Sequence, residues 1–167
     1  ALARSLQEIV QRHESLRTTF DVRDGTPVQV ITRQLTVQLP LLDLSDIPEA
    51  TRQAHALDLV TSEARRPFDL QAGPLLRASL YRLNPQNHIL LIVIHHIISD
   101  GWSTNIFYGE LATLYTSAVR GKSVVLPPLP TQYADYAVWQ RQWLRGETLA
   151  QQLAYWKTQL AAAPALD

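Results

Sequence analysis

The alternation of hydrophobic and polar residues predicts a chain in which helices and strands follow one another closely. Over 2–14, apolar residues recur every three to four positions, which is the spacing of a helix with one buried face. Two strands are predicted next, at 16–22 and 28–31, and Asp24-Gly25 between them is typical of a β-hairpin turn. A further short strand is expected at 36–41.

The centre of the chain predicts a helix followed by two paired strands. The helix contains an apolar pattern over 57–64 and ends before Pro67, because the residue preceding a proline is driven out of the helical conformation. Strands are expected at 75–83 and 89–94, and the turn-forming residues 84–87 join them. The second strand consists of six consecutive aliphatic residues, so we expect it to be buried on both faces.

The rest of the pattern predicts three helices and an extended connector. Ser103 is expected to cap the first of these helices, which ends near Gly121. Three prolines in five residues predict that 126–130 is an extended connector. Two further helices are expected over 133–144 and 149–160, separated by a glycine.

The predicted elements fall into two parts. Residues 1–122 contain the strands and are expected to form one α/β lobe, while residues 123–167 begin with the connector. A chain of 167 residues with 46% hydrophobic content is long enough to bury one core. The chain has no methionine, and Ala1-Leu2 already lies inside the first helical pattern, so we expect it to be part of a longer polypeptide.

Charge and residue types exclude several kinds of partner and site. With 15 basic and 15 acidic residues, the chain lacks the electrostatic signature of a protein that binds nucleic acid or an anionic membrane. No apolar run reaches the roughly 18 residues of a membrane span. The absence of cysteine excludes disulfides, thiolate metal sites and a cysteine nucleophile, and it suits a cytoplasmic location.

Candidate chemistry lies at the end of the aliphatic strand. Because neighbouring side chains on a strand point to opposite faces, one of His95 and His96 is expected to face the core and the other a cleft. This geometry argues against a metal site built from both histidines and Asp100. The histidine in the cleft can act as a general base, or as a hydrogen-bond acceptor that positions a nucleophile.

Each neighbouring polar position has more than one interpretation. Asp100 either orients the imidazole through Nδ1, as in a catalytic triad, or braces the loop against an arginine. Gly101 permits an unusual backbone angle and close approach of a substrate, and its N–H can stabilise an oxyanion. The same spacing also fits two core histidines followed by a simple turn. On spacing alone, Arg12 and Arg17 are a helix-end cation and a solvated strand-end charge.

Three separated segments resemble, in order, the second, third and fourth core motifs of condensation domains of nonribosomal peptide synthetases. The first runs from Arg12 to Phe20 (Arg-His-Glu-Ser-Leu-Arg-Thr-Thr-Phe). The second runs from Ile94 to Ser103 (Ile-His-His-Ile-Ile-Ser-Asp-Gly-Trp-Ser), and the third from Tyr133 to Trp139 (Tyr-Ala-Asp-Tyr-Ala-Val-Trp). Together these segments span most of the chain.

The resemblance implies a fold similar to that of chloramphenicol acetyltransferase, with two α/β lobes arranged in a V. This chain would hold the first lobe, a mixed sheet flanked by helices, and would end before the second. The implied reaction is attack by an acceptor aminoacyl thioester on a donor acyl or peptidyl thioester, which forms an amide. Both substrates would be carried on phosphopantetheine arms of carrier domains, with an adenylation domain in the same parent chain. No cofactor or metal would be bound directly, and the products would be secondary metabolites such as antibiotics.

The resemblance also implies a role for each residue of the central motif. His96 would be the catalytic residue, either as a base or as the group that positions the amine, and Gly101 would be the backbone that the substrate approaches. His95 would be structural, and Asp100 would brace the loop through an arginine. The local candidates for that arginine are Arg12, which we prefer, and Arg17.

Three other functions are compatible with these motifs. An epimerisation domain shares the His-His motif, and a free acyltransferase of the same superfamily would use a soluble thioester. A lobe that only docks carrier proteins would need no catalytic histidine, and the intact His96 counts against it. The first motif, expected before Ala1, and the fifth to seventh motifs are absent, so we expect the isolated chain to be inactive.

Overall fold

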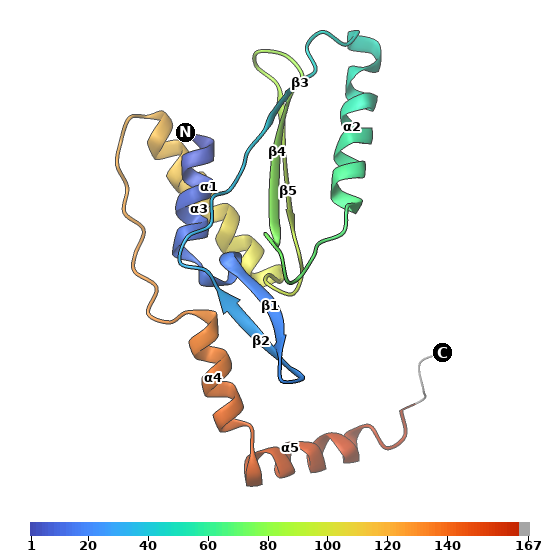
Figure 1. Ribbon diagram of the computed structural model, residues 1–167, viewed down its shortest axis with the longest axis vertical. Helices are drawn as coiled ribbons and strands as arrows, with labels where there is room; N and C mark the ends of the chain where they lie inside the picture. Colours follow the sequence, from blue (N-terminus) through green and yellow to red (C-terminus); the bar gives the residue numbers. More distant parts are fainter. Residues whose placement is uncertain (164–167) are drawn as a thin grey trace. The chain divides into compact units, whose positions relative to one another are not determined.

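The computed structural model describes residues 1–163 and divides into two units, Ala1–Pro128 and Leu129–Asp167. A small mixed sheet between helices forms the centre of the first unit (Figure 1). The first unit contains a hairpin as well. In chain order its elements are α1 (Leu2–Arg12), the 3₁₀ helix η1 (Glu14–Arg17), β1 (Thr18–Arg23), β2 (Thr26–Ile31), β3 (Leu41–Asp43), α2 (Glu49–Arg65), β4 (Leu76–Arg82), β5 (His88–Ile94) and α3 (Gly101–Val119).

The sheet has the strand order β3-β4-β5, with β3 parallel and β5 antiparallel to β4. Helices α1 and α3 lie side by side on one face, and α2 lies on the other (Figure 1). Side chains of β4 alternate between these faces, because Ala78 belongs to the core of α1 and α3 whereas Tyr81 packs with Ala56 of α2. The main core is formed by Leu6, Ile9 and Val10 of α1, Leu76 and Ala78 of β4, and Phe107, Leu111 and Leu114 of α3.

The predicted hairpin is confirmed. Strands β1 and β2 pair antiparallel, and the turn residues Asp24 and Gly25 have positive φ angles of 51° and 73°. These angles match the right-handed twist of the two strands, which explains why an Asp-Gly pair stands there. The predicted helices and the two central strands are also present. Most of their ends lie within about three residues of the prediction, but α2 begins at Glu49, eight residues before the apolar pattern that predicted it.

The strand predicted at 36–41 is largely wrong. Residues 36–40 have no regular structure, and β3 begins only at Leu41. The side-chain amide of Gln7 takes the place of a neighbouring strand, since its Nε2 donates to Leu35 O at 2.7 Å and its Oε1 accepts from Val37 N at 2.9 Å. The backbone C=O of Leu35 and N–H of Val37 thus form their hydrogen bonds with a side chain of α1 rather than with a neighbouring strand.

Strand β5 is not buried on both faces as expected. Its aliphatic residues, 89–94, are only half-buried, and His88 is exposed. Within the described residues β5 has a single neighbour, β4, and therefore forms an edge of the sheet. A continuous aliphatic run predicted a central strand, and sequence alone does not reveal which neighbours that strand has.

The second unit contains α4 (Tyr133–Trp143) and α5 (Gly146–Gln159). The unit boundary lies after Pro128 rather than after residue 122, because Val124 and Leu126 pack against the core of the first unit. The carbonyl of Pro127 also accepts a hydrogen bond from Arg12 Nη2. None of the helices in the described residues is both long and apolar enough to cross a bilayer.

Candidate functional site

His95 is held in place directly after β5. Its backbone N donates to Leu75 O at 2.9 Å, and its Nδ1 accepts from Ile97 N at 3.0 Å. The half-buried ring meets the Phe68 ring edge-on, with the centroids 5.7 Å apart and the planes at 82°. Because Nδ1 accepts an N–H, we assign the proton of the neutral ring to Nε2.

His96 lies in the turn that follows and is exposed. In the described part of the chain, its imidazole makes no hydrogen bond or ion pair, in contrast to the fixed ring of His95. The two rings therefore differ in their surroundings, but the cause is a turn and not the alternation of a strand, because β5 ends at Ile94. A free imidazole at the end of a rigid strand can bind or move a proton on a substrate.

Asp100, not Ser103, is the N-cap of α3. The carboxylate Oδ1 of Asp100 accepts from Ser103 N at 2.8 Å, and Ser103 Oγ accepts from Asp100 N at 2.7 Å. The pair forms a capping box, which satisfies two backbone N–H groups that a helix start would leave without partners. The hydrogen bonds from the backbone and side chain of Ser103 lower the pKa of Asp100, and the positive charge of a protonated His96 has a smaller effect in the same direction.

The expected ion pair between Asp100 and an arginine is wrong for this structure. Arg12 Nε binds Glu110 Oε1 at 3.0 Å, and Arg17 donates to the carbonyl of Thr32 and to Glu14. Within the described residues, neither arginine contacts Asp100, whose carboxylate already has the local donors of Ser103. Sequence reasoning placed Asp100 correctly in the loop. It could not foresee that Ser103, three positions away, would bind the carboxylate in place of a distant arginine.

Gly101 is the first residue of α3 and is exposed. Its φ angle is not positive, and a Cβ added there would meet no atom within 4 Å. The expected unusual backbone angle is therefore absent, and packing within the described residues does not require a glycine.

Glu110 makes a partly buried connection between helices that sequence reasoning missed. Its Oε1 binds Arg12 Nε at 3.0 Å and its Oε2 lies 2.7 Å from His13 Nε2, so one carboxylate joins α3 to the end of α1. Only 14% of its side chain is exposed. A detectable signal was present, because Glu110 is the single charged residue between Gly101 and Val119.

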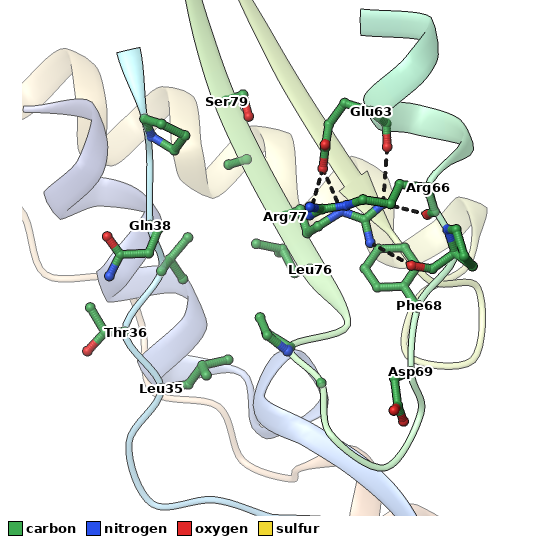
Figure 2. A pocket seen from close by; sticks show the side chains of 16 residues that line it. Leu35, Thr36, Gln38, Glu63, Arg66, Phe68, Asp69, Leu76, Arg77 and Ser79 are labelled. Atoms are coloured by element: carbon green, nitrogen blue, oxygen red, sulfur yellow. Dashed lines mark hydrogen bonds and ion pairs between the residues drawn. The ribbon is translucent and has the colours of Figure 1, made fainter. Parts of the chain in front are cut away.

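Two cavities lie near these elements. A small one of about 80 Å³ adjoins the histidine loop and is lined by His13, Ile98, Ser99 and Ser103 among others. A larger one of about 430 Å³ lies between β4 and the extended residues 35–40, and Figure 2 shows Arg77 and Phe68 among the side chains that line it. No group of three or more His, Cys, Asp or Glu side chains in the described residues is arranged to hold a metal ion.

The condensation domain family model matches residues 1–167. The chain belongs to the condensation domain family. A linear gramicidin synthase protein of Brevibacillus parabrevis is 51% identical over 166 residues, which cover 99% of this chain and 2% of that protein.

Solved condensation domain structures confirm the expected fold class. The starter condensation domain of rhizomide synthetase RzmA matches with a TM-score of 0.85 and 22% identity over 98% of this chain and 39% of that chain. The epimerization domain from the third module of tyrocidine synthetase B matches with a TM-score of 0.83 and 25% identity over 99% and 37%. This condensation domain chain thus spans well under half of these structures and a small share of the synthetase.

Proposed function

We propose that this chain forms part of an active site in which the amine of an acceptor aminoacyl thioester attacks the carbonyl carbon of a donor acyl or peptidyl thioester. The new carbon–nitrogen bond makes an amide, the carbon–sulfur bond breaks, and the proton of the amine passes to the departing thiolate. Donor and acceptor arrive on the phosphopantetheine arms of two carrier domains, with an adenylation domain in the same parent protein. The observation that carries this proposal is the exposed imidazole of His96, which has no partner in the described residues.

His96 is suited to act on the attacking amine. A neutral imidazole has one nitrogen with a free lone pair, which can accept an N–H of the amine and either remove the proton or orient the nitrogen. The turn that presents His96 is fixed on both sides, by the Nδ1 bond of His95 and by the Asp100–Ser103 cap. A fixed acceptor lowers the entropic cost of bringing amine and thioester together.

Gly101 has a second role in the proposed reaction. Its backbone N–H lies at the first position of α3 and makes no hydrogen bond within the described residues. The start of a helix carries a partial positive charge, and a free N–H there can stabilise the oxyanion that forms on the attacked carbonyl. The absence of a side chain at Gly101 leaves that N–H accessible.

Epimerisation is the second candidate, because the chain has the same fold as the tyrocidine synthetase B epimerization domain. In that reaction the imidazole would exchange the Cα proton of an aminoacyl thioester, and no amide would form. The two candidates differ in product, so mass spectrometry of the carrier-bound species separates them. Uptake of deuterium from the solvent at Cα without a new amide would favour epimerisation.

The test is to replace each histidine in the full-length protein that contains this chain and to supply loaded donor and acceptor carriers. His96→Ala should lower the rate of amide formation by roughly 10²- to 10⁴-fold and leave thermal unfolding unchanged, since the exposed ring packs against little. His95→Ala should lower the unfolding temperature, because it removes the contacts to Phe68 and Ile97. Unchanged amide formation by His96→Ala would overturn the proposal.

A further inference from the structure

Arg77 of β4 is a mostly buried cation bound to the end of α2. Its Nε binds Glu63 Oε1 at 2.7 Å, and its Nη2 donates to Glu63 O at 3.1 Å and Arg66 O at 2.7 Å. Its Nη1 donates to Pro67 O at 3.3 Å. Figure 2 shows the guanidinium enclosed by these acceptors, and only 12% of the side chain is exposed. The carbonyls at the C-terminal end of a helix favour a cation, so Arg77 is held firmly.

The same guanidinium covers one face of Phe68. Arg77 Cζ lies 3.8 Å from the centre of the Phe68 ring, which is a close cation–π contact. Phe68 in turn meets His95 edge-on, with the ring centres 5.7 Å apart, and His95 Nδ1 accepts the N–H of Ile97. These contacts form a continuous chain from Arg77 to the turn that contains His96.

The backbone supports the histidine turn from the same strand. Arg77 is paired with Val93 in the register of β4 and β5, and Leu75 accepts the backbone N–H of His95. The start of β4 therefore fixes both the backbone and, through Phe68, the ring of His95. The ring contact is the part of this support that a change of side chain can remove while the strand pairing stays intact.

We propose that Arg77 is a positioning residue for the reaction, acting through Phe68 and His95 on the turn that presents His96. This inference rests on the proposed function, in which His96 meets the attacking amine. Arg77 touches neither His96 nor the space around it, so its effect is on the placement of the imidazole and not on its chemistry. A small misplacement of a reacting group can lower a rate by about 10²-fold.

The experiment compares three variants and a matched control in the full-length protein. Phe68→Leu removes the ring but leaves the bonds of Arg77 to α2, Arg77→Met removes the cation, and Phe68→Tyr keeps the ring. The control is Arg82→Met, which removes another arginine of β4 that is ion-paired, with Asp43, at the opposite end of the strand. Steady-state kinetics with loaded carriers give kcat and KM, and hydrogen–deuterium exchange reports on the N–H of Ile97.

Phe68→Leu and Arg77→Met should lower kcat by roughly 10- to 100-fold with KM changed by less than about twofold, and they should speed exchange at Ile97. Phe68→Tyr and Arg82→Met should resemble the original protein in both measurements. Phe68→Leu gives the decisive result if Arg77→Met folds poorly, because it leaves the α2 contacts in place.

Unchanged exchange at Ile97 in Phe68→Leu would overturn the inference, and so would an equal loss of kcat in Arg82→Met. Failure of the proposed function is a separate result. It would appear as an active His96→Ala protein, whereas the exchange measurement reports on the contact chain whichever reaction the protein catalyses.

Discussion

Asp100 and Ser103 bind one another twice across the first turn of α3. The carboxylate of Asp100 accepts the backbone N–H of Ser103 at 2.8 Å, and the hydroxyl of Ser103 accepts the backbone N–H of Asp100 at 2.7 Å. This reciprocal pair sets where α3 begins, and its N-cap Asp100 lies four residues after the exposed His96. The direction in which the chain leaves the histidine turn therefore depends on a local contact.

Replacement of Asp100 should affect stability according to how well the new residue caps a helix. Asp100→Ala should lower the unfolding temperature of the full-length protein's domain by about 2–4 °C, whereas Asp100→Asn should keep most of the stability because asparagine is also a good N-cap. Thermal unfolding of both variants tests this difference. Ser103→Ala should add little to Asp100→Ala, since each change breaks the same pair, and full additivity would contradict the capping box.

The cap should also depend on pH. Ser103 lowers the pKa of Asp100 below its ordinary value of 3.8, so the ionised carboxylate contributes stability that is complete above this value. That contribution is lost as the pH falls through the lower pKa of the folded state. The advantage of the original protein over Asp100→Asn in urea unfolding should therefore shrink as the pH is lowered from about 5 to about 2. A difference that stays constant over this range would show that the charge is irrelevant.

Gly73 is a position where a side chain should be strongly destabilising. Its φ angle is +59°, and an added Cβ would lie 2.7 Å from Cγ2 of Thr19. Gly73→Ala should therefore cost more than the roughly 1–2 kcal/mol that a left-handed backbone costs an ordinary residue. Gly25→Ala is the matched control, because Gly25 has φ +73° with no atom near the added Cβ.

Denaturant unfolding of Gly25→Ala and Gly73→Ala separates the cost of the left-handed backbone from the cost of the contact with Thr19. Gly25→Ala should show the backbone cost alone, and Thr19→Ser should partly rescue Gly73→Ala because serine lacks Cγ2. Equal losses in Gly73→Ala and Gly25→Ala, without rescue, would mean that the contact with Thr19 is unimportant.

Residues 1–167 expressed alone should neither form amides nor stay monomeric. The chain spans 37–39% of the length of the two matched structures. Within the described residues, the aliphatic strand β5 pairs with β4 on one side and has no neighbouring strand on the other. Such an edge offers its free backbone groups to another chain. Sizing chromatography and an assay with loaded carriers, each beside the full-length protein, test this expectation. A monomeric fragment that is as active as the full-length protein would contradict it.

Local patterns predicted the elements, whereas contacts between distant residues decided what the sequence could not show. The hairpin at Asp24-Gly25 and the end of α2 before Pro67 follow from backbone preferences of one or two residues, and both are present. The missing strand at 36–40 depends on Gln7, which is about 30 positions away and whose amide binds the backbone there. No periodicity reveals such a partner.

In the candidate site, too, the sequence predicted the positions of residues but not their partners. The exposed His96 and the loop position of Asp100 were expected from the motif, but the partner of Asp100 was not. A motif records which residues recur together and not which atoms touch. The two arginines near the end of α1 were plausible partners until the structure showed them bound to Glu110 and to Thr32.

The side chain of Arg12 has a mechanical consequence for the first unit. It joins the end of α1 to Glu110 of α3 and to the carbonyl of Pro127, where the proline-rich connector begins. A proline-rich segment is stiff and takes up little extension. The hydrogen bond from Arg12 and the packing of Val124 and Leu126 therefore hold the start of the connector against the first unit, so a pull on the chain beyond Pro127 would load these contacts as well as the backbone that leads to α3.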